Sequence, residues 1–332
     1  MNIIVPMAGQ GKRFRPHTHS TPKPLFPIAG KPIVQRIVED IAGIYQGNIQ
    51  EIAFVTGRFG SEVEDKLLSV AASLGAVGRI FYQDEALGTA HAIWCARECL
   101  SGETIIAFAD TLFRADFAMD KSKDGVIWVH PVEDPRSFGV VTLDDSGNIA
   151  QFVEKPEVFV SDLAIIGIYY VKNGQDLHKE IQYLLDNNVL NKGEYQLTDA
   201  LENLKSKGHK FGPGIVTAWM DCGNKDAVLS TNQKILSDNP KAATTAKNTT
   251  LNNALIVEPC FIGDNVTIQN SVVGPFVSVE TGAIIQNGVV KNSIIREKSH
   301  VNGLFLENSI LGQFTNAQKL PRCLNLGDHT TL

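Results

Sequence analysis

Two short stretches near the start of the sequence combine glycines with cations, a pattern that suits phosphate groups. They are Gly9-Gln10-Gly11-Lys12-Arg13 and Pro22-Lys23-Pro24-Leu25. Glycines that follow a strand let backbone N–H groups approach phosphate oxygens closely. The two prolines fix the backbone beside Lys23 and so aim its ammonium group. The residues expected to bind a nucleotide are therefore Ala8, Gly9 and Gly11, and the expected catalytic cations are Arg13 and Lys23.

The distribution of charge favours the same kind of ligand. The first 38 residues contain six basic side chains and no acidic one, although the whole chain has a net charge of −6. A local cationic region on an acidic protein suits a small polyanion such as a triphosphate, whereas a nucleic-acid polymer is not an expected partner. The glycine loop is not a dinucleotide fingerprint, because Phe14 replaces the third glycine. It is not a Walker A loop either, because no Gly-Lys-Ser/Thr sequence ends it.

Two aspartates are placed to bind a divalent metal. Asp110 follows the apolar run 105–109, and Asp221 follows the run 216–220. Carboxylates at the ends of neighbouring strands can hold Mg²⁺ against phosphate oxygens. We therefore expect Asp110 and Asp221 to bind Mg²⁺, although each of them alone would serve equally well as a turn former or a helix cap.

The elements that must position these residues alternate between strand and helix. Apolar, β-branched runs predict strands at 2–5, 51–56, 79–83 and 104–109, with helical patterns between them. This alternation predicts an α/β fold with βαβ units and a mostly parallel sheet. Ligands bind at the carboxyl ends of such strands, so the residues that follow them should share one crevice. Those residues are Gly9, Gly11, Gly88 and Asp110.

Downstream of these units the spacing of the elements changes. Closely spaced strands are expected from 125 to 171, followed by helices at 175–187 and 195–207. A strand is then expected at 215–220 and a helix at 225–237.

The last part of the sequence has a period of six. After a polar segment at 238–250, aliphatic residues recur every six positions, as at Ile256, Ile262 and Ile268. Such a period is typical of a parallel β-helix, in which each coil buries its aliphatic residues by stacking on the next. The sequence therefore predicts a catalytic domain at 1–237, a linker at 238–250 and a β-helix at 251–332. The β-helix is expected to support a homo-oligomer.

Cysteine usage and hydropathy indicate a cytoplasmic protein with no membrane partner. No apolar run reaches the roughly 18 residues that a membrane helix needs. The N-terminal residues lack the basic region and long apolar stretch of a secretory signal. Few and scattered cysteines indicate free thiols in a reducing compartment. These cysteines are Cys95, Cys99, Cys222, Cys260 and Cys323.

Together these motifs resemble those of the sugar-1-phosphate nucleotidylyltransferase family, above all its glucose-1-phosphate thymidylyltransferases and uridylyltransferases. The resemblance extends to about Leu236, although Lys12 and Cys222 stand where the family usually has threonine. It implies an α/β, Rossmann-like domain with a mixed, mostly parallel central sheet, followed by a short left-handed parallel β-helix. It also implies Mg²⁺-dependent transfer of a nucleotidyl group from UTP or dTTP to a sugar-1-phosphate such as glucose-1-phosphate, with release of pyrophosphate. The matching segments are 8–14, 22–25, 83–92, 137–141, 152–156, 165–169, 193–200 and 219–223.

The resemblance also implies a role for each matching residue. Arg13 would contact the β- and γ-phosphates, and Lys23 the α-phosphate. Gln83, Gly88 and Thr89 would hold the nucleobase, since an amide can donate and accept hydrogen bonds at once. We interpret His91 in the same segment as a packed helical histidine rather than a catalyst.

For the sugar, the resemblance implies contacts from Gly139, Glu154 and Gly167 to the hydroxyl groups and from Lys155 to the phosphate. The segment 193–200 is interpreted mainly as a helix start beside the sugar pocket. The same residues remain compatible with a guanylyltransferase that acts on mannose-1-phosphate, or with a regulatory relative that binds nucleotide sugars without catalysis. An acyltransferase acting through the β-helix is disfavoured, because this region is short and contains only His300 and His329 as histidines.

Overall fold

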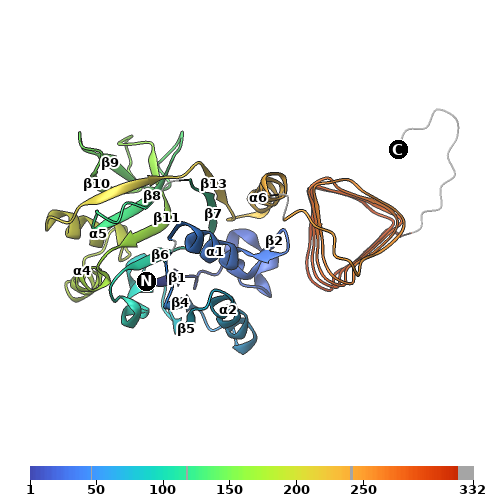
Figure 1. The fold of residues 1–332 in the computed structure, drawn as a ribbon, viewed down its shortest axis with the longest axis horizontal. Helices are drawn as coiled ribbons and strands as arrows, with labels where there is room; N and C mark the ends of the chain where they lie inside the picture. The colour runs from blue at the N-terminus through green and yellow to red at the C-terminus, as the bar shows by residue number, and fades with distance from the viewer. Residues whose placement is uncertain (46, 117–118, 240–241, 321–332) are drawn as a thin grey trace. The chain divides into compact units, whose positions relative to one another are not determined.

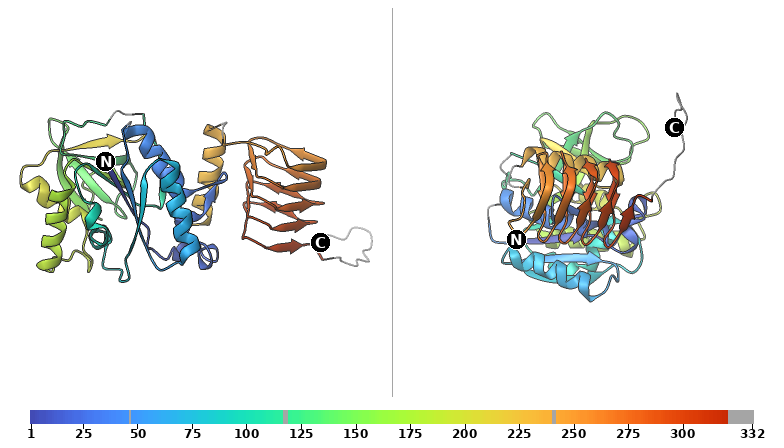
Figure 2. Two further views of the ribbon diagram at one scale, coloured as in Figure 1. Left: turned by 60° about the horizontal axis from the view of Figure 1, so that its bottom comes forward. Right: turned by 90° about the vertical axis from the view of Figure 1, so that its right-hand side faces the viewer.

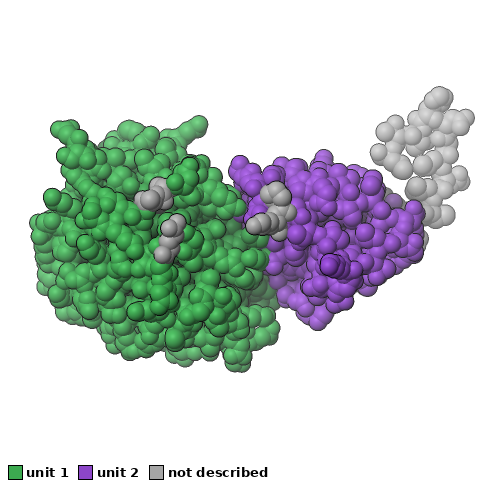
Figure 3. Space-filling model, in the orientation of Figure 1, with its two compact units in different colours: residues 1–26, 31–223 green, residues 27–30, 224–332 purple. Residues whose placement is uncertain are grey.

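The computed structural model describes residues 1–45, 47–116, 119–239 and 242–320, and the chain forms two compact units (Figure 3). The first unit comprises 1–26 and 31–223, and the second comprises 27–30 and the chain from 224 onward. Helix α6 (Lys225–Asp238) therefore belongs to the second unit. The domain limits 1–237, 238–250 and 251–332 stay predictions, and Cys323 and His329 lie outside the described residues.

The first unit is built on a mixed sheet, which within the described residues has nine strands (Figure 1). Its central strands carry β-branched and aromatic residues that are buried on both faces, as in sheets covered by helices on either side. Strands β1, β4, β5 and β6 pair parallel, and β11 pairs antiparallel with β6 and β8. The strands are β1 (Asn2–Pro6), β4 (Glu51–Thr56), β5 (Val77–Tyr82), β6 (Thr104–Ala107), β8 (Gly125–Pro131), β9 (Gly139–Leu143), β10 (Ile149–Glu154), β11 (Leu163–Val171) and β12 (Phe211–Ile215).

Helices cover both faces of this sheet (Figure 2). One face packs against α3 (Thr89–Cys95), α4 (Gly174–Asp186) and α5 (Leu197–Ser206), whose apolar residues form one core with the strands. The other face lies against α1 (Ile33–Tyr45) and α2 (Ser61–Ser73). The predicted α/β architecture with a mixed, mostly parallel sheet is thus confirmed.

One predicted strand is divided between two sheets. The expected strand at 215–220 is wrong as a single element, because β12 ends at Ile215 and β13 (Ala218–Asp221) begins three residues later. The Val216 N–H still donates to Val129 O of the large sheet, whereas the Thr217 N–H donates to Arg114 O. Strand β13 then pairs antiparallel with β7 (Thr111–Arg114), which places Asp221 opposite Thr111. The change of sheet brings the end of β13 beside Asp110.

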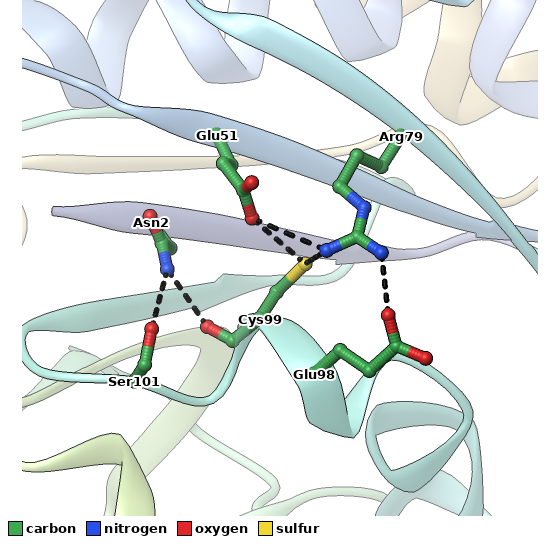
Figure 4. Close-up of polar contacts among 6 residues, drawn as sticks. All are labelled: Asn2, Glu51, Arg79, Glu98, Cys99 and Ser101. Atoms are coloured by element: carbon green, nitrogen blue, oxygen red, sulfur yellow. Dashed lines mark hydrogen bonds and ion pairs between the residues drawn. The ribbon is translucent and has the colours of Figure 1, made fainter.

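At the amino ends of the parallel strands, polar side chains pair with one another (Figure 4). Asn2 Nδ2 donates to Cys99 O at 3.0 Å, and the Cys99 thiol donates to Glu51 Oε2 at 3.2 Å. Arg79 forms an ion pair with Glu51 at 3.6 Å and another with Glu98 at 2.5 Å. Burial, together with the hydrogen bond to Glu51, raises the pKa of Cys99 to about 12, so this thiol stays protonated and structural.

The second unit is a parallel β-helix, as the period of six predicts (Figure 2). Every pairing between its described strands is parallel, and Ile268, Ile285 and Val301 stack in one inward row at intervals of 17 and 16 residues. One group of strands is β14 (Thr250–Ile256), β16 (Thr267–Val273), β18 (Ile284–Gln286), β19 (Val289–Lys291), β21 (His300–Asn302), β22 (Phe305–Glu307) and β24 (Asn316–Gln318). The other group is β15 (Cys260–Ile262), β17 (Val277–Val279), β20 (Ile294–Ile295) and β23 (Ile310–Leu311).

Asparagines form the corners of successive coils. Asn253, Asn270 and Asn287 have φ values of 47°, 46° and 52°, in the left-handed region that asparagine tolerates better than most residues. Their side chains form a ladder, in which Asn253 donates to Asn270 at 3.0 Å and Asn270 to Asn287 at 3.2 Å. Within the same unit, the buried Asn232 of α6 accepts from Ala29 N at 3.0 Å and from Ser278 Oγ at 2.7 Å. Residues 27–30 have the strand β2 (Pro27–Ile28), and the first unit resumes with β3 (Lys31–Pro32).

Candidate active site

The glycine loop after β1 opens onto a cavity of about 650 Å³ in the first unit. Gly11 has φ 57° and begins the short 3₁₀ turn Lys12–Phe14. The buried Phe14 ring packs edge-on against Phe26 at 4.7 Å and so anchors this turn. Among the residues that were given a binding or catalytic role from the sequence, those that line the cavity are Ala8, Gly9, Gly11, Arg13, Lys23, Gln83, Gly88, Thr89 and Asp110. The predicted crevice shared by the two loop glycines, Gly88 and Asp110 is therefore confirmed.

Lys23 and Asp110 meet at the wall of this cavity. The Lys23 Nζ lies 3.5 Å from Asp110 Oδ2, and the two side chains are 12% and 53% exposed. Lys23 begins a 3₁₀ turn between its two prolines, which holds the lysine stem against the protein while its charge faces the aspartate. A cation and an anion are thus positioned together beside the glycine loop.

Asp221 lies next to Asp110 through the antiparallel pairing of β7 and β13. The Cys222 N–H donates to Asp110 O at 3.1 Å, and Asp221 Oδ1 accepts from the Gly223 N–H at 2.9 Å. A Cβ atom placed on Gly223 would lie about 3.0 Å from Asp221 Oδ1 and 3.1 Å from an Arg13 guanidinium nitrogen. Gly223 therefore separates Asp221 from Arg13 with no room for a side chain between them.

These carboxylates have the chemistry that a divalent cation of the magnesium type requires. Mg²⁺ prefers oxygen ligands and is commonly held by one or two carboxylates together with phosphate oxygens and water. Within the described part of the chain, no cluster of three or more His, Cys, Asp or Glu side chains could hold a metal without such additional ligands. Asp110 and Asp221, whose backbones are neighbours in the fold, offer carboxylates of this kind.

The far side of the cavity is formed where β5 leads into α3. The Gln83 N–H donates to Thr56 O at 3.0 Å and extends β5, and the Gln83 amide nitrogen donates to Gly88 O at 3.2 Å. Gly88 has φ 118°, and a Cβ atom there would lie 2.4 Å from Tyr195 O, so no other residue fits. Thr89 Oγ1 accepts from Leu197 N at 2.9 Å, which ties the start of α3 to α5.

The residues expected to hold the sugar gather on β9, β10 and β11. Glu154 and Gly139 are paired across β9 and β10, and Thr198 Oγ1 donates to Glu154 Oε2 at 3.1 Å. Lys155 lies in the left-handed region, with φ 44°, and its Nζ is 3.4 Å from Glu154 Oε1. Gly167 accepts from the N–H of Phe108, a cavity residue, at 2.9 Å.

This second group lies beside the cavity rather than in its wall. Of the described residues, the cavity lining includes Phe108 but leaves out Gly139, Glu154, Lys155, Gly167 and Asp221. Tyr169 is buried, and burial raises the pKa of its hydroxyl, with the negative charges of Glu154 and Asp110 raising it further. The two predicted groups are thus neighbours whose charges act on one buried phenol.

Only part of the predicted cationic region reaches the cavity. Lys12, Arg13 and Lys23 line it, whereas Lys31 pairs with Glu39 at 2.8 Å. Arg36 is buried in α1, and this burial lowers its pKa to about 10 despite the charges of Asp40 and Glu39. The excess of basic residues in the sequence thus combines ligand-facing cations with structural ones.

Glu194 and Thr18 are among the residues at the site that the sequence reasoning missed. Glu194 lines the cavity, although its segment was interpreted mainly as a helix start, and its position directly after Gly193 was the available signal. Thr18 donates from its hydroxyl to Gly11 O at 2.9 Å and so braces the glycine loop. No spacing rule points to Thr18, because the contact depends on how the chain folds back after the loop.

The family and the relatives that match this chain agree with one another. The family described as Nucleotidyl transferase matches residues 2–238. A glucose-1-phosphate thymidylyltransferase of Streptomyces griseus is 27% identical, over 99% of this chain and 98% of that protein. The bifunctional protein GlmU of Methanocaldococcus jannaschii is 31% identical, over 71% of this chain and 54% of its own length. A solved UDP-glucose pyrophosphorylase, in complex with UDP-glucose, matches the fold with a TM-score of 0.57 and 24% identity, covering 72% of this chain and 99% of that one. No helix in the described parts of the chain is long and apolar enough to cross a membrane.

Proposed function

The chain belongs to the nucleotidyl transferase family, and on that premise we propose that it transfers the nucleotidyl group of UTP or dTTP to a sugar-1-phosphate such as glucose-1-phosphate. The products are a nucleoside diphosphate sugar and pyrophosphate. The observation that carries the proposal is the position of Lys23 and Asp110, 3.5 Å apart beside the glycine loop in one cavity. The names of the relatives support the sugar-1-phosphate as the acceptor.

The side of the cavity formed by the glycine loop is assigned to the triphosphate. Backbone N–H groups of Ala8, Gly9 and Gly11 bind phosphate oxygens, and Arg13 contacts the β- and γ-phosphates. Lys23 contacts the α-phosphate, where negative charge builds up as the new bond forms. Its ammonium, held between two prolines, needs little rearrangement to do so.

The sugar-1-phosphate is assigned to the group beside the cavity. The Glu154 carboxylate accepts hydrogen bonds from sugar hydroxyls, with Gly139 and Gly167 leaving space for the ring. Lys155 neutralises the sugar phosphate, since an ammonium and a phosphate form a charge-assisted hydrogen bond. Its ion pair with Glu154 at 3.4 Å, with the lysine 47% exposed, is weak enough for a phosphate to replace.

Transfer then needs positioning and charge rather than a covalent intermediate. A phosphate oxygen of the sugar-1-phosphate attacks the α-phosphorus in line, the bond to the β-phosphate oxygen breaks, and pyrophosphate leaves. The attacking phosphate is already ionised near neutral pH, so the protein has no proton to remove. Arg13, Lys23 and Lys155 hold the two substrates in line and offset the charge of the transition state.

Mg²⁺ is assigned to Asp110 and Asp221. When bound, it would neutralise part of the negative charge on the phosphates. The chain contributes the carboxylates of Asp110 and Asp221, two residues whose backbones the β7–β13 pairing and the bond from Cys222 N–H to Asp110 O bring side by side. Asp110 already pairs with one cation, the Lys23 ammonium, which supports cation binding at this carboxylate.

Pyrophosphate release is the direct test. The purified chain is incubated with Mg²⁺, glucose-1-phosphate and each of UTP, dTTP, GTP, CTP and ATP, and the nucleotide sugar is identified by mass spectrometry. We expect release with UTP or dTTP that depends on the sugar-1-phosphate. Absence of release with all five triphosphates across a panel of sugar-1-phosphates would refute the proposal.

A pair of lysine variants locates the activity. Lys23→Met should lower kcat by about 100-fold or more, because a cation that acts on the transition state is lost. Lys31→Met is the matched control, since Lys31 lies in the same basic stretch but pairs with Glu39. Equal loss in both variants would remove Lys23 from the mechanism.

A cytoplasmic location and a homo-oligomer formed through the β-helix are also proposed. The described cysteines are all free thiols, which supports the reducing environment of a cytoplasm. Association of copies through the β-helix is checked by light scattering of the full chain. A truncation that ends near Ser237 and keeps the native oligomer size would exclude that role.

A further inference from the structure

Two neighbours of the Gln83 amide nitrogen fix the orientation of this side chain. Its Nε2 donates to Gly88 O at 3.2 Å and lies 3.3 Å from His91 Nδ1. A carbonyl oxygen only accepts, so Gly88 already requires the nitrogen on its side of the amide. With both hydrogens engaged, Oε1 is the atom that Gln83 has left to offer a ligand in the cavity that it lines.

His91 is held in place as firmly as the amide. It lies on α3, half-buried, and its ring stacks on Trp94 at 6.1 Å with an angle of 18° between the planes. The Arg97 guanidinium lies over the Trp94 ring, 4.2 Å from its centroid, and the Trp94 Nε1 donates to Gln182 Oε1 at 2.8 Å.

Burial lowers the pKa of His91, although Glu85 opposes this, and a neutral imidazole has one acceptor nitrogen. The Gln83 amide nitrogen beside Nδ1, held by Gly88 O, assigns that acceptor to Nδ1.

From this geometry we propose that His91 is a positioning residue for nucleobase selection, because its Nδ1 keeps the Gln83 amide turned so that Oε1 faces the base. The inference deepens the proposed function and rests on it. Gln83 then accepts a hydrogen bond and donates none to the base. The histidine touches no substrate and acts through Gln83 alone.

A fixed acceptor divides the nucleobases into two classes. Uracil and thymine carry an N–H at the centre of their pairing edge, as guanine does, and can donate to Oε1. Cytosine and adenine present a bare ring nitrogen there, so two acceptors would face each other. A site that hydrogen-bonds one chemical group rejects an analogue that lacks it, because its own polar atom is left unpaired.

A comparison of UTP with CTP tests this inference, because their bases differ at that edge whereas their ribose and triphosphate groups are identical. His91→Phe keeps a ring to stack on Trp94 and removes the acceptor, whereas His91→Asn places an amide oxygen where Nδ1 was. His178→Phe, on α4, is the matched control for replacing a helical histidine. The kcat/KM values for UTP and CTP are measured with saturating sugar-1-phosphate, and the affinities for both are measured by titration calorimetry.

We expect the wild-type chain to prefer UTP and His91→Phe to reduce the UTP-to-CTP ratio about tenfold, mainly through the KM for UTP. His91→Asn should recover most of the ratio, and His178→Phe should leave it unchanged. An unchanged ratio in His91→Phe, or a His91→Asn variant that resembles His91→Phe, would overturn the role of the Nδ1 acceptor. If His91→Phe does not fold, His91→Met replaces it, since methionine suits both a helix and an irregular apolar gap.

The calorimetric arm separates this inference from the proposed function. Discrimination between UTP and CTP in binding is measurable even if no pyrophosphate is released with any acceptor. A chain that turns over but does not distinguish UTP from CTP refutes only the inference. A chain that binds UTP selectively through His91 but releases no pyrophosphate refutes only the proposed function.

Discussion

Polar residues have opposite surroundings at the two ends of the parallel strands in the first unit. At the amino ends, Asn2, Glu51 and Cys99 are paired with one another or with their neighbours (Figure 4). At the carboxyl ends, polar residues instead surround a cavity of about 650 Å³, with Lys23 and Asp110 at 3.5 Å in its wall. The same strands therefore support a closed structural network at one end and an open site at the other.

The difference teaches how to separate structural from functional polar residues. A buried polar group costs free energy unless it is hydrogen-bonded, so residues paired at the amino ends are explained by the fold itself. Cations and glycines that face an open cavity have no such explanation. Substitutions at the amino ends should therefore change stability, and substitutions at the carboxyl ends should change activity.

The largest effect should come from Asp110. We expect Asp110→Asn to lower kcat/KM by about 100-fold or more, because the proposed metal site loses one of its two charged ligands. Its side chain is 53% exposed, so the melting temperature should change little. Pyrophosphate release at saturating Mg²⁺ and thermal unfolding measure the two quantities, with the exposed Asp65→Asn as the control. Near-wild-type turnover in Asp110→Asn would end the metal assignment.

Gly9 should give the next largest effect. A Cβ atom on Gly9 meets nothing within 4 Å, and its backbone is not in the left-handed region, so Gly9→Ala should fold normally. The added methyl group would still occupy space that the phosphates need, and we expect about a tenfold to 100-fold loss of kcat/KM. Steady-state kinetics with a thermal melt checks this. A fully active Gly9→Ala variant would show that phosphate does not approach this loop.

Gly174 is the counterpart of Gly9 at the amino ends of the strands. A Cβ atom there would lie 2.7 Å from Thr104 Oγ1 and 2.9 Å from the Leu100 carbonyl carbon. Gly174→Ala should therefore cost about 1–3 kcal/mol of unfolding free energy through overpacking while kcat/KM stays unchanged. Urea unfolding gives the first value and the pyrophosphate assay the second. Loss of activity without loss of stability would break the contrast between the two ends.

The smallest effect concerns the pH dependence of stability at the amino ends. The Tyr45 hydroxyl donates to Glu103, as does that of Tyr170, and these bonds lower the pKa of Glu103 below 4.5 although burial opposes them. A carboxylate with a lowered folded-state pKa stabilises the protein above its unfolded pKa, and this stabilisation is lost as pH falls below about 4.5. Because Glu103 is partly exposed, the contribution is at most about 1 kcal/mol.

Unfolding curves at pH 7 and pH 3.5 test this prediction. Glu103→Gln should be less stable than the wild-type chain at pH 7, and the difference should shrink at pH 3.5. A difference that is the same at both pH values would mean that Glu103 contributes through packing rather than charge.

The local parts of the molecule could be predicted from the sequence because their signals are local. The glycine loop, the run before Asp110 and the period of six in the β-helix each depend on residues within one turn or one coil. The alternation of strands with helices also fixed which loops lie at the carboxyl ends of the sheet, and hence that Gly88 and Asp110 line one cavity.

Contacts between distant segments were decided only by the tertiary structure. The sequence predicted one strand at 215–220, whereas the chain changes sheet there, because the backbone hydrogen bonds of Val216 and Thr217 go to different strands. That change places Asp221 beside Asp110, and no spacing between the two residues encodes it. The sequence likewise gives no distinction between Lys23 in the cavity and Lys31 outside it.

The sequence by itself thus determined the kinds of chemistry available: glycines and cations of the types that suit phosphate, two carboxylates, and a β-helix that follows them. Only the tertiary structure decided which of these groups meet, including the hydrogen bond between Gln83 and His91. The physical reason is that residue type and short-range periodicity set local conformation, whereas the approach of two side chains depends on how strands far apart in the chain pair and pack.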